Sequence, residues 1–433
     1  MNIKKLKDQV DAAELYTTET SSRRVRLKGG RVQSSHLEES LGKALRVIKD
    51  RHLGFSFTTD QDGEEELVEA AIESSLHGDR VDFTFPEQQK SAPLDIYDPQ
   101  LRDLSEREMV KIGRNVFEIL AEADHEVDSD ITVDRTLRTT EIENSSGLHV
   151  RIEKTTLNVS FGVKRFKPDD ILFFFRSSNS THRTNDYQAV AHDAAQKLML
   201  ANPYQGILKG KLPVIFTPIA LNSLLLSLNS ALNGKQVLLG VSPLGSRYGE
   251  LIVDEKFTLI DNGTMPGRSS SAPYDDEGIP VKPIKLIDKG ILAHFFYDLK
   301  AAHEAGVSPT GHGRRVFSSL PSPNLHHIDI EPGDLPFEEM LKEVQEGLYV
   351  DVLMSTGRAS MYTGDFSFPI ALGYVIQGGE IVGRVKNLTI SGNLYQLLKN
   401  HLVALENRSH ILSLYSPIRA PHILAEGVQV LSN

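Results

Sequence analysis

Residues 357–392 constrain the fold more than any other stretch, because their pattern is that of a β-hairpin. Two apolar runs rich in β-branched side chains, residues 370–376 and 380–385, flank the tripeptide Gln377-Gly378-Gly379. Glycine adopts positive φ in such a turn without a steric cost, so the two runs are predicted to pair as antiparallel strands. The stretch therefore predicts a hairpin that packs on a core.

The rest of the chain repeats this arrangement of neighbouring strands between separate helices. Residues 23–28 and 31–38 are strand-like and meet at the hairpin turn Gly29-Gly30. Helical patterns cover residues 64–76 and 218–233, and the second is apolar on nearly all sides, so it is predicted to be buried. Because adjacent strands argue against βαβ units, the sequence predicts an α+β fold: two small sheet-and-helix units followed by a larger β-rich C-terminal domain.

A chain of 433 residues is expected to form more than one domain. We predict an N-terminal α+β unit at residues 1–80, a proline-bearing linker at 81–100, a second α+β unit at 101–208 and the C-terminal domain at 209–433. The second unit begins with Ser105-Glu106-Arg107-Glu108, the pattern of a capping box that starts a helix.

The composition narrows the classes of function. The net charge of −11 disfavours binding to a nucleic-acid backbone, which requires clustered Lys and Arg. The chain has no cysteine, which excludes disulfides, cysteine nucleophiles and thiolate metal ligands. It starts with a polar, lysine-rich segment and has no apolar run of about 18 residues. We therefore expect neither a signal peptide nor a membrane span, and a cytoplasmic protein.

Three local clusters suggest function, and each has a plainer interpretation. Phe173-Phe174-Phe175 could stack on nucleic-acid bases, but the lack of interleaved basic residues favours a strand buried on both faces. His326-His327 would point to opposite faces of a strand, so at most one of them could serve a metal site. Asp275-Asp276-Glu277 lacks the spacing of a calcium loop, which favours a solvated or backbone-capping role.

Five short segments carry a resemblance that spans essentially the whole chain. They are NSSG at 144–147, DDEGIP at 275–280, TGHGRR at 310–315, TGDFS at 363–367 and TISGN at 389–393. In this order they resemble the signature segments of the TldD/PmbA family. The resemblance implies a three-part α+β protein.

A zinc site distinguishes the two branches of that family. The TldD branch is similar to a zinc peptidase, with HExxxH on the first helix of the third segment and a cysteine near the C-terminus. At the matching positions this chain reads LSLNSA, residues 226–231, with Ser227 in place of the glutamate. The cysteine position falls near Tyr415-Ser416. The resemblance therefore implies the PmbA branch, also called TldE, and a chain that binds no stoichiometric zinc and hydrolyses no peptide alone.

The resemblance also implies a role and partners. We expect a metal-free subunit without a cofactor, acting in the proteolysis of unfolded peptides as a homodimer or as a heterodimer with a TldD-like metallopeptidase. The alternative is a non-enzymatic binding protein that modulates a partner such as DNA gyrase, and a third option is a peptidase that uses carboxylates such as Asp365 or Asp276. Neither direct contact with nucleic acid nor a membrane is expected, and no catalytic residue or metal ligand is predicted. The candidate signature or peptide-contact residues are Asp275, Asp276, Glu277, Gly278, Thr363, Gly364, Asp365 and Asn393.

Overall fold

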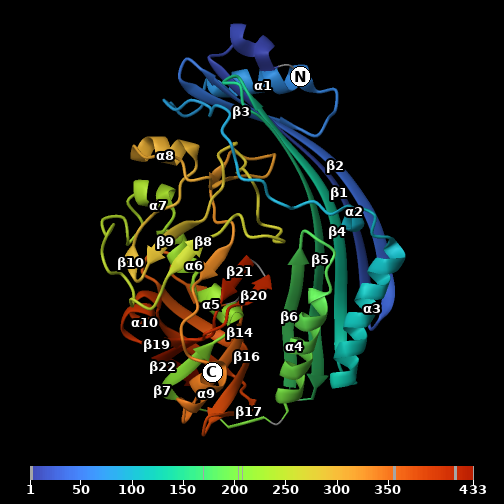
Figure 1. Ribbon diagram of the computed structural model, residues 1–433, viewed down its shortest axis with the longest axis vertical. Coiled ribbons are helices and arrows are strands. Elements are labelled where there is room, and N and C mark those ends of the chain that lie inside the picture. The colour runs from blue at the N-terminus through green and yellow to red at the C-terminus, as the bar shows by residue number, and fades with distance from the viewer. Residues whose placement is uncertain are drawn as a thin grey trace.

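A long antiparallel sheet forms one side of the molecule (Figure 1). The computed structural model describes residues 3–168, 170–202, 204–206, 208–354, 357–413 and 417–432. The strands of this sheet are β1 (Ala12–Lys28), β2 (Arg31–Lys49), β3 (His52–Thr58), β4 (Asp128–Asn144), β5 (His149–Lys167) and β6 (Asp170–Ser180). They lie in the order β3-β2-β1-β4-β5-β6, so β6 is an edge strand.

Strand β1 joins the first two sheet-and-helix units into this one sheet. It pairs with β2 through a turn at Gly29 and Gly30, whose φ angles of 53° and 72° are the positive values that the hairpin turn requires. Its other edge pairs with β4, where Glu14 lies opposite Asn144. The predicted α+β fold is confirmed, but the sequence did not indicate the shared sheet, because pairing between distant segments leaves no local pattern. The predicted domain boundaries stay predictions.

Helices pack on this sheet and anchor its connections. The capping box is present: the Ser105 hydroxyl accepts from the Glu108 amide at 3.3 Å, and the Glu108 carboxylate accepts from the Ser105 amide at 2.9 Å. In the predicted linker, Val81, Phe83 and Phe85 are buried, so this segment packs against the rest of the chain. The helices are α1 (Glu64–Ser75), α2 (Pro99–Arg102), α3 (Glu106–Ala123), α4 (Asp186–Leu200) and the short 3₁₀ helix η1 (Ile3–Asp8).

A sheet that closes on itself is the core of the β-rich C-terminal domain. Its strands are β7 (Gly210–Phe216), β14 (Glu346–Leu353), β15 (Arg358–Ala359), β16 (Asp365–Gln377), β17 (Glu380–Arg384), β18 (Leu388–Asn393), β19 (Leu402–Leu405) and β22 (Ile423–Ser432). The order β14-β7-β22-β18-β16 closes because the first half of β16 pairs with β18 and its second half pairs with β14. The predicted hairpin is the β16–β17 pair, with positive φ at Gly378 and Gly379.

A second C-terminal sheet has the strand order β10-β9-β8-β13-β21-β20, and β11 pairs with β12 beside it. These strands are β8 (Leu259–Asp261), β9 (Ile284–Asp288), β10 (Ile291–Leu292), β11 (Gly313–Arg314), β12 (Ser322–Pro323), β13 (Ile328–Ile330), β20 (His410–Ser413) and β21 (Pro417–Ala420). The helices of the domain are α5 (Pro218–Leu224), α6 (Leu226–Ala231), α7 (Gly234–Leu238), α8 (Leu299–Ala305), α9 (Phe337–Lys342) and α10 (Leu394–Asn400).

The apolar stretch after β7 lies in the core, as its sequence predicts. Thr217 caps α5 by accepting from the Ala220 amide at 3.3 Å, and Pro218 takes the first helical position. The predicted single helix, residues 218–233, is interrupted at Leu225 and forms the two short helices α5 and α6, and α7 follows it. None of the described helices has the length and apolar character needed to cross a membrane.

Candidate functional site

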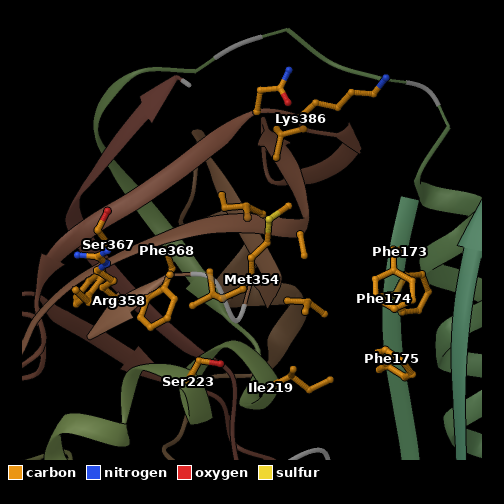
Figure 2. Close-up of a pocket in the computed structure, with 18 of the residues that line it drawn as sticks. Phe173, Phe174, Phe175, Ile219, Ser223, Met354, Arg358, Ser367, Phe368 and Lys386 are labelled. Atoms are coloured by element: carbon orange, nitrogen blue, oxygen red, sulfur yellow. The ribbon is translucent and has the colours of Figure 1, made fainter. Parts of the chain in front are cut away.

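A groove of about 1630 Å³ lies between the edge strand β6 of the long sheet and the closed C-terminal sheet (Figure 2). Phe173 and Phe175 of β6 line one wall, and the end of β14, strand β15 and β16 line the other. Ile219 and Ser223 of helix α5 line it between these walls. The two sides thus come from the second unit and from the C-terminal domain.

Strand β6 turns one aromatic face to the core and the other to the groove. The Phe174 side chain is buried, whereas Phe173 and Phe175 are 40% and 42% exposed and pack edge to face with ring centroids 4.9 Å apart. The prediction that this strand is buried on both faces is wrong. Its second face is open because an edge strand here borders a groove rather than another layer of the core.

The facing wall is also largely apolar. Met354 and Met361 are 43% and 40% exposed, and unbranched methionine side chains adapt to partners of different shape. The side chain of Arg358, in β15, is exposed on the same wall and has no hydrogen-bond or ion-pair partner in the described part of the chain. The wall therefore offers adaptable apolar contacts and, at Arg358, a cation that pairs with no described residue.

The open edge of β6 presents backbone groups toward the C-terminal domain. The carbonyl of Ile171 accepts from Arg384 at 3.1 Å, and that of Phe175 accepts from Arg176 at 3.0 Å. Since backbone groups of alternate residues face the same edge of a strand, those of Phe173 lie between these two contacts. Asp170 holds Arg384 in place by accepting from it at 2.9 Å. Among the described strands, none pairs with this edge.

The helix side of the groove does not fit a catalytic zinc ion. Leu226 and Ala231, at the two histidine positions of the zinc motif, have no lone pair to donate, and Ser227 replaces the general base. The described residues that line the groove include no His, Cys or Glu. The expected cysteine position, Tyr415-Ser416, lies outside the described residues. The donor set of the groove is thus unlike a zinc centre.

Four of the predicted site residues form a turn at the rim of the groove. The Asp365 carboxylate accepts from the Thr363 hydroxyl at 2.7 Å and from the Asn393 side-chain amide at 2.9 Å. Hydrogen bonds from Asn393 and Thr363 lower the pKa of Asp365. Gly364 has φ 78° in this turn, and the Asn393 side-chain oxygen caps α10 by accepting from Tyr395 and Gln396 amides. The motif shapes the rim, and Asp365 also lines the groove.

The other four predicted site residues lie away from the groove and bind a second signature loop. Asp275 accepts from the amides of Glu277 and Ile279 at 3.0 and 2.9 Å and from that of Gly313 at 2.8 Å. Asp276 accepts from the Arg315 amide at 2.9 Å. Burial and the charge of Glu277 raise the pKa of Asp275 well above its usual range. Segments 275–280 and 310–315 are therefore one structural unit.

Glu277 connects this unit to the long sheet through a buried ion network. Arg46 of β2 donates to Glu277 at 2.8 Å and to both oxygens of Glu14 at 2.9 and 2.8 Å. Arg315 donates to Glu14 at 2.7 Å. Burial alone would raise the pKa of Glu14, but the charges of Arg46 and Arg315 outweigh it and lower the pKa. These four side chains are almost fully buried, so the network fixes the C-terminal domain against β1 and β2.

Two further motif residues belong to the same structural unit. Gly278 has φ 79°, and a Cβ at this position would lie 2.3 Å from the Leu148 side chain. Asn144, in the NSSG segment, accepts from the amides of Ser146 and Leu148 and so shapes the turn that presents Leu148. Three of the five signature segments thus meet in one place.

The predicted histidine pair does not serve the groove. His326 and His327 are both buried, and neither lines the groove. His326 contacts the Gly311 carbonyl at 2.7 Å and Arg314 at 3.1 Å, which ties it to the second signature loop. Burial lowers the pKa of both rings to about 4, so both are neutral.

Comparison with known proteins finds matches to the sequence and to the fold. Residues 209–432 match the model of the PmbA/TldA metallopeptidase C-terminal domain, and residues 13–75 match PmbA/TldA metallopeptidase domain 1. A metalloprotease of Methanothermobacter thermautotrophicus is 25% identical over 414 residues, covering 91% of this chain and 88% of the relative. The Haemophilus influenzae PmbA homolog, a metalloprotease, is 26% identical over 56% of this chain and 51% of its own length.

Solved structures share the fold over nearly the whole length. TldE from Thermococcus kodakarensis superposes with a TM-score of 0.92, at 22% identity and with 99% of each chain covered. Protein TM0727 from Thermotoga maritima, a proposed modulator of a DNA gyrase, superposes with a TM-score of 0.88, at 24% identity and with 97% of this chain and 96% of that chain covered.

Proposed function

Because this chain belongs to the PmbA/TldD family of metallopeptidase-like proteins, we propose that it is a family subunit with no zinc in its groove. In this role it holds unfolded peptides in extended form, and a catalytic partner cleaves them. The observation that carries the proposal is the open apolar groove beside the outer edge of β6, with which no other described strand pairs.

The size of the groove favours a polymer over a small molecule. Sites for small ligands typically enclose about 300–1,000 Å³, and this groove of about 1630 Å³ exceeds that range. Its exposed Phe173, Phe175, Met354 and Met361 match side chains that are buried in folded proteins and exposed in unfolded ones. The lining therefore selects for unfolded segments.

The backbone of β6 supplies a binding mode that does not depend on peptide sequence. An extended peptide can add a strand beside Phe173 and gain main-chain hydrogen bonds, while the aromatic rings contact alternate side chains. The exposed Arg358 side chain on the opposite wall offers an ion pair to a carboxylate of the peptide. Cleavage is assigned to the partner because the groove lacks the ligand set and the base of a zinc peptidase.

The test combines this chain with a TldD-like chain that carries HExxxH. We expect the two to co-elute from a sizing column and to cleave an unfolded, fluorescently labelled peptide in a chelator-sensitive reaction. This chain alone should bind the peptide without cleaving it, and Phe175→Ser should weaken both binding and joint cleavage. Chelator-sensitive cleavage by this chain alone would overturn the proposal.

A second outcome would favour the other function class. If the chain neither binds the peptide nor associates with a TldD-like partner, a non-proteolytic binding protein is the better description. Association with DNA gyrase is then tested by the same co-elution experiment. Leu37→Ser, which removes an exposed apolar side chain of β2 outside the groove, is the matched control for Phe175→Ser.

A further inference from the structure

Three possible metal ligands meet outside the groove, where β19, β20 and β22 come together. Glu406 follows β19, His410 begins β20 and His422 precedes β22. The Glu406 Oε2 atom lies 2.8 Å from His410 Nε2 and 2.6 Å from His422 Nδ1. One ligand atom from each residue lies within 4.8 Å of the other two. None of the three residues lines the groove.

The backbone holds these residues in register. The amide of Glu406 donates to the His422 carbonyl at 2.9 Å, and the Glu406 carbonyl accepts from Gly333 at 2.9 Å. His410 lies opposite Ala420 in the β20–β21 ladder. Ala420 is two residues before His422, so His410 lies near His422. Because backbone hydrogen bonds hold Glu406 beside His422, and the β20–β21 ladder holds His410 near both, the ligand atoms need little reorganisation to bind an ion.

Neighbouring residues supply the outer contacts that metal-binding histidines usually have. The Tyr349 hydroxyl lies 3.1 Å from His422 Nε2, which leaves Nδ1 facing Glu406 and His410. Lys197 donates to the same hydroxyl at 2.7 Å and so holds Tyr349 in place. The Phe337 ring, with its centroid 4.7 Å from that of His422, covers the imidazole.

We propose that Glu406, His410 and His422 bind one Zn²⁺ ion, with water in the fourth position. Two imidazoles and one carboxylate are a ligand set typical of zinc with an open coordination position. The His410 side chain is 41% exposed, which gives the ion a path from solvent and room for the water. Zinc–ligand bonds of about 2.0–2.2 Å need only small outward shifts of the ligand atoms from their present contacts. This site replaces the expectation that the chain holds no stoichiometric zinc, and it is independent of the peptide groove.

The experiment uses the full chain without a histidine tag, stripped of metal by a chelator. Zn²⁺ is titrated in competition with a chromophoric chelator, and Co²⁺ is added separately to record the visible absorption of a four-coordinate site. We expect one Zn²⁺ per chain. Both His410→Ala and Glu406→Gln should weaken Zn²⁺ binding by at least about tenfold.

Two controls make the outcome unambiguous. His36→Ala removes an exposed histidine from β2 and should leave the affinity for Zn²⁺ unchanged. Circular dichroism of each variant, and peptide binding by the groove, are measured on the same samples, so failure of the zinc site and failure of the proposed function are separately visible. The inference is overturned if wild-type protein binds less than about 0.1 Zn²⁺ per chain at micromolar free Zn²⁺, or if folded His410→Ala binds Zn²⁺ as tightly as wild type.

Discussion

The structural unit formed by segments 275–280 and 310–315 differs from the groove in which side chains it buries. The unit buries charged side chains, whereas the groove exposes apolar ones. Around Glu277 the charges are buried, and the contacts of Arg46 with Glu14 and Glu277 hold two carboxylates to one guanidinium. In the groove, Phe173 is exposed, and Arg358 has no partner in the part of the chain that the structure describes. The charges of the first region are paired within the chain, whereas the second region exposes apolar surface that another molecule can cover.

This difference explains why the signature segments can be recognised in the sequence and the groove lining cannot. A buried charge is costly unless its partner is present, so each member of the ion network requires the others. Segments 275–280 and 310–315 join the C-terminal domain to the long sheet through this network. Their residue types are therefore constrained by the buried partners that each must pair with. A peptide groove requires only apolar character and a free strand edge, which many residues can provide.

Removing the Arg46 side chain should have the largest effect on stability. It tests whether segments 275–280 and 310–315 have a structural role. Arg46→Ala leaves Glu277 buried without its cation, so the free energy of unfolding should fall by about 3–5 kcal/mol. Urea denaturation followed by circular dichroism measures the loss. Arg31→Ala, an exposed arginine on the same strand, should change stability by less than about 0.5 kcal/mol. Similar losses for the two variants would contradict the structural role.

A smaller effect should appear in the pH dependence of stability. Burial and the charge of Glu277 raise the pKa of Asp298 to about 6, above its usual value. Because the folded state binds the Asp298 proton more tightly than the unfolded state, this proton stabilises the fold. The stabilisation is fully present below the pKa that Asp298 has in the unfolded chain, and it is lost as pH rises through about 6. Its slope is at most about 1.4 kcal/mol per pH unit, the slope for one proton.

Asp298→Asn tests this, because asparagine keeps the cap of α8, where Asp298 accepts from the Ala301 amide at 2.7 Å. Unfolding at pH 5, 6 and 7 should show a shallower decline for the variant than for wild type. Identical pH profiles would show that Asp298 does not titrate in this range.

The smallest effect on stability is expected in the groove, together with the clearest effect on binding. Phe173→Ser removes a side chain that is already 40% exposed, so stability should change by less than about 1 kcal/mol. The affinity for an unfolded apolar peptide should fall at least about fivefold, or about 1 kcal/mol, by fluorescence anisotropy. Leu37→Ser should leave binding unchanged, and a large loss of stability with unchanged binding in Phe173→Ser would reverse the comparison.

Local patterns in the sequence predict local structure well. The glycine turns at 29–30 and 378–379, the Ser105 capping box and the buried helix after Thr217 are all present, because each depends on residues close in sequence. The resemblance to the family segments placed Asp365 and Asn393 in one candidate set, and they share a hydrogen bond.

The missed features depend on contacts between distant segments. Phe173-Phe174-Phe175 is apolar on both faces, so its sequence cannot show that one face borders a groove. No sequence pattern grouped Glu406, His410 and His422, which come together only through the backbone pairing of the last part of the chain. The role of Glu277 was likewise hidden, because its partner Arg46 lies in a different predicted unit.

The position of β1 in the middle of the long sheet has a consequence for synthesis on the ribosome. Its partner β2 follows at once, but β4 begins only at Asp128, so one edge of β1 waits while the intervening chain is made. An unpaired edge invites pairing with other chains. The segment TTETSSRR within β1 is polar and charged, which makes this edge a poor template for aggregation. A nascent chain halted before Asp128 therefore exposes a strand edge that is polar over these eight residues rather than apolar.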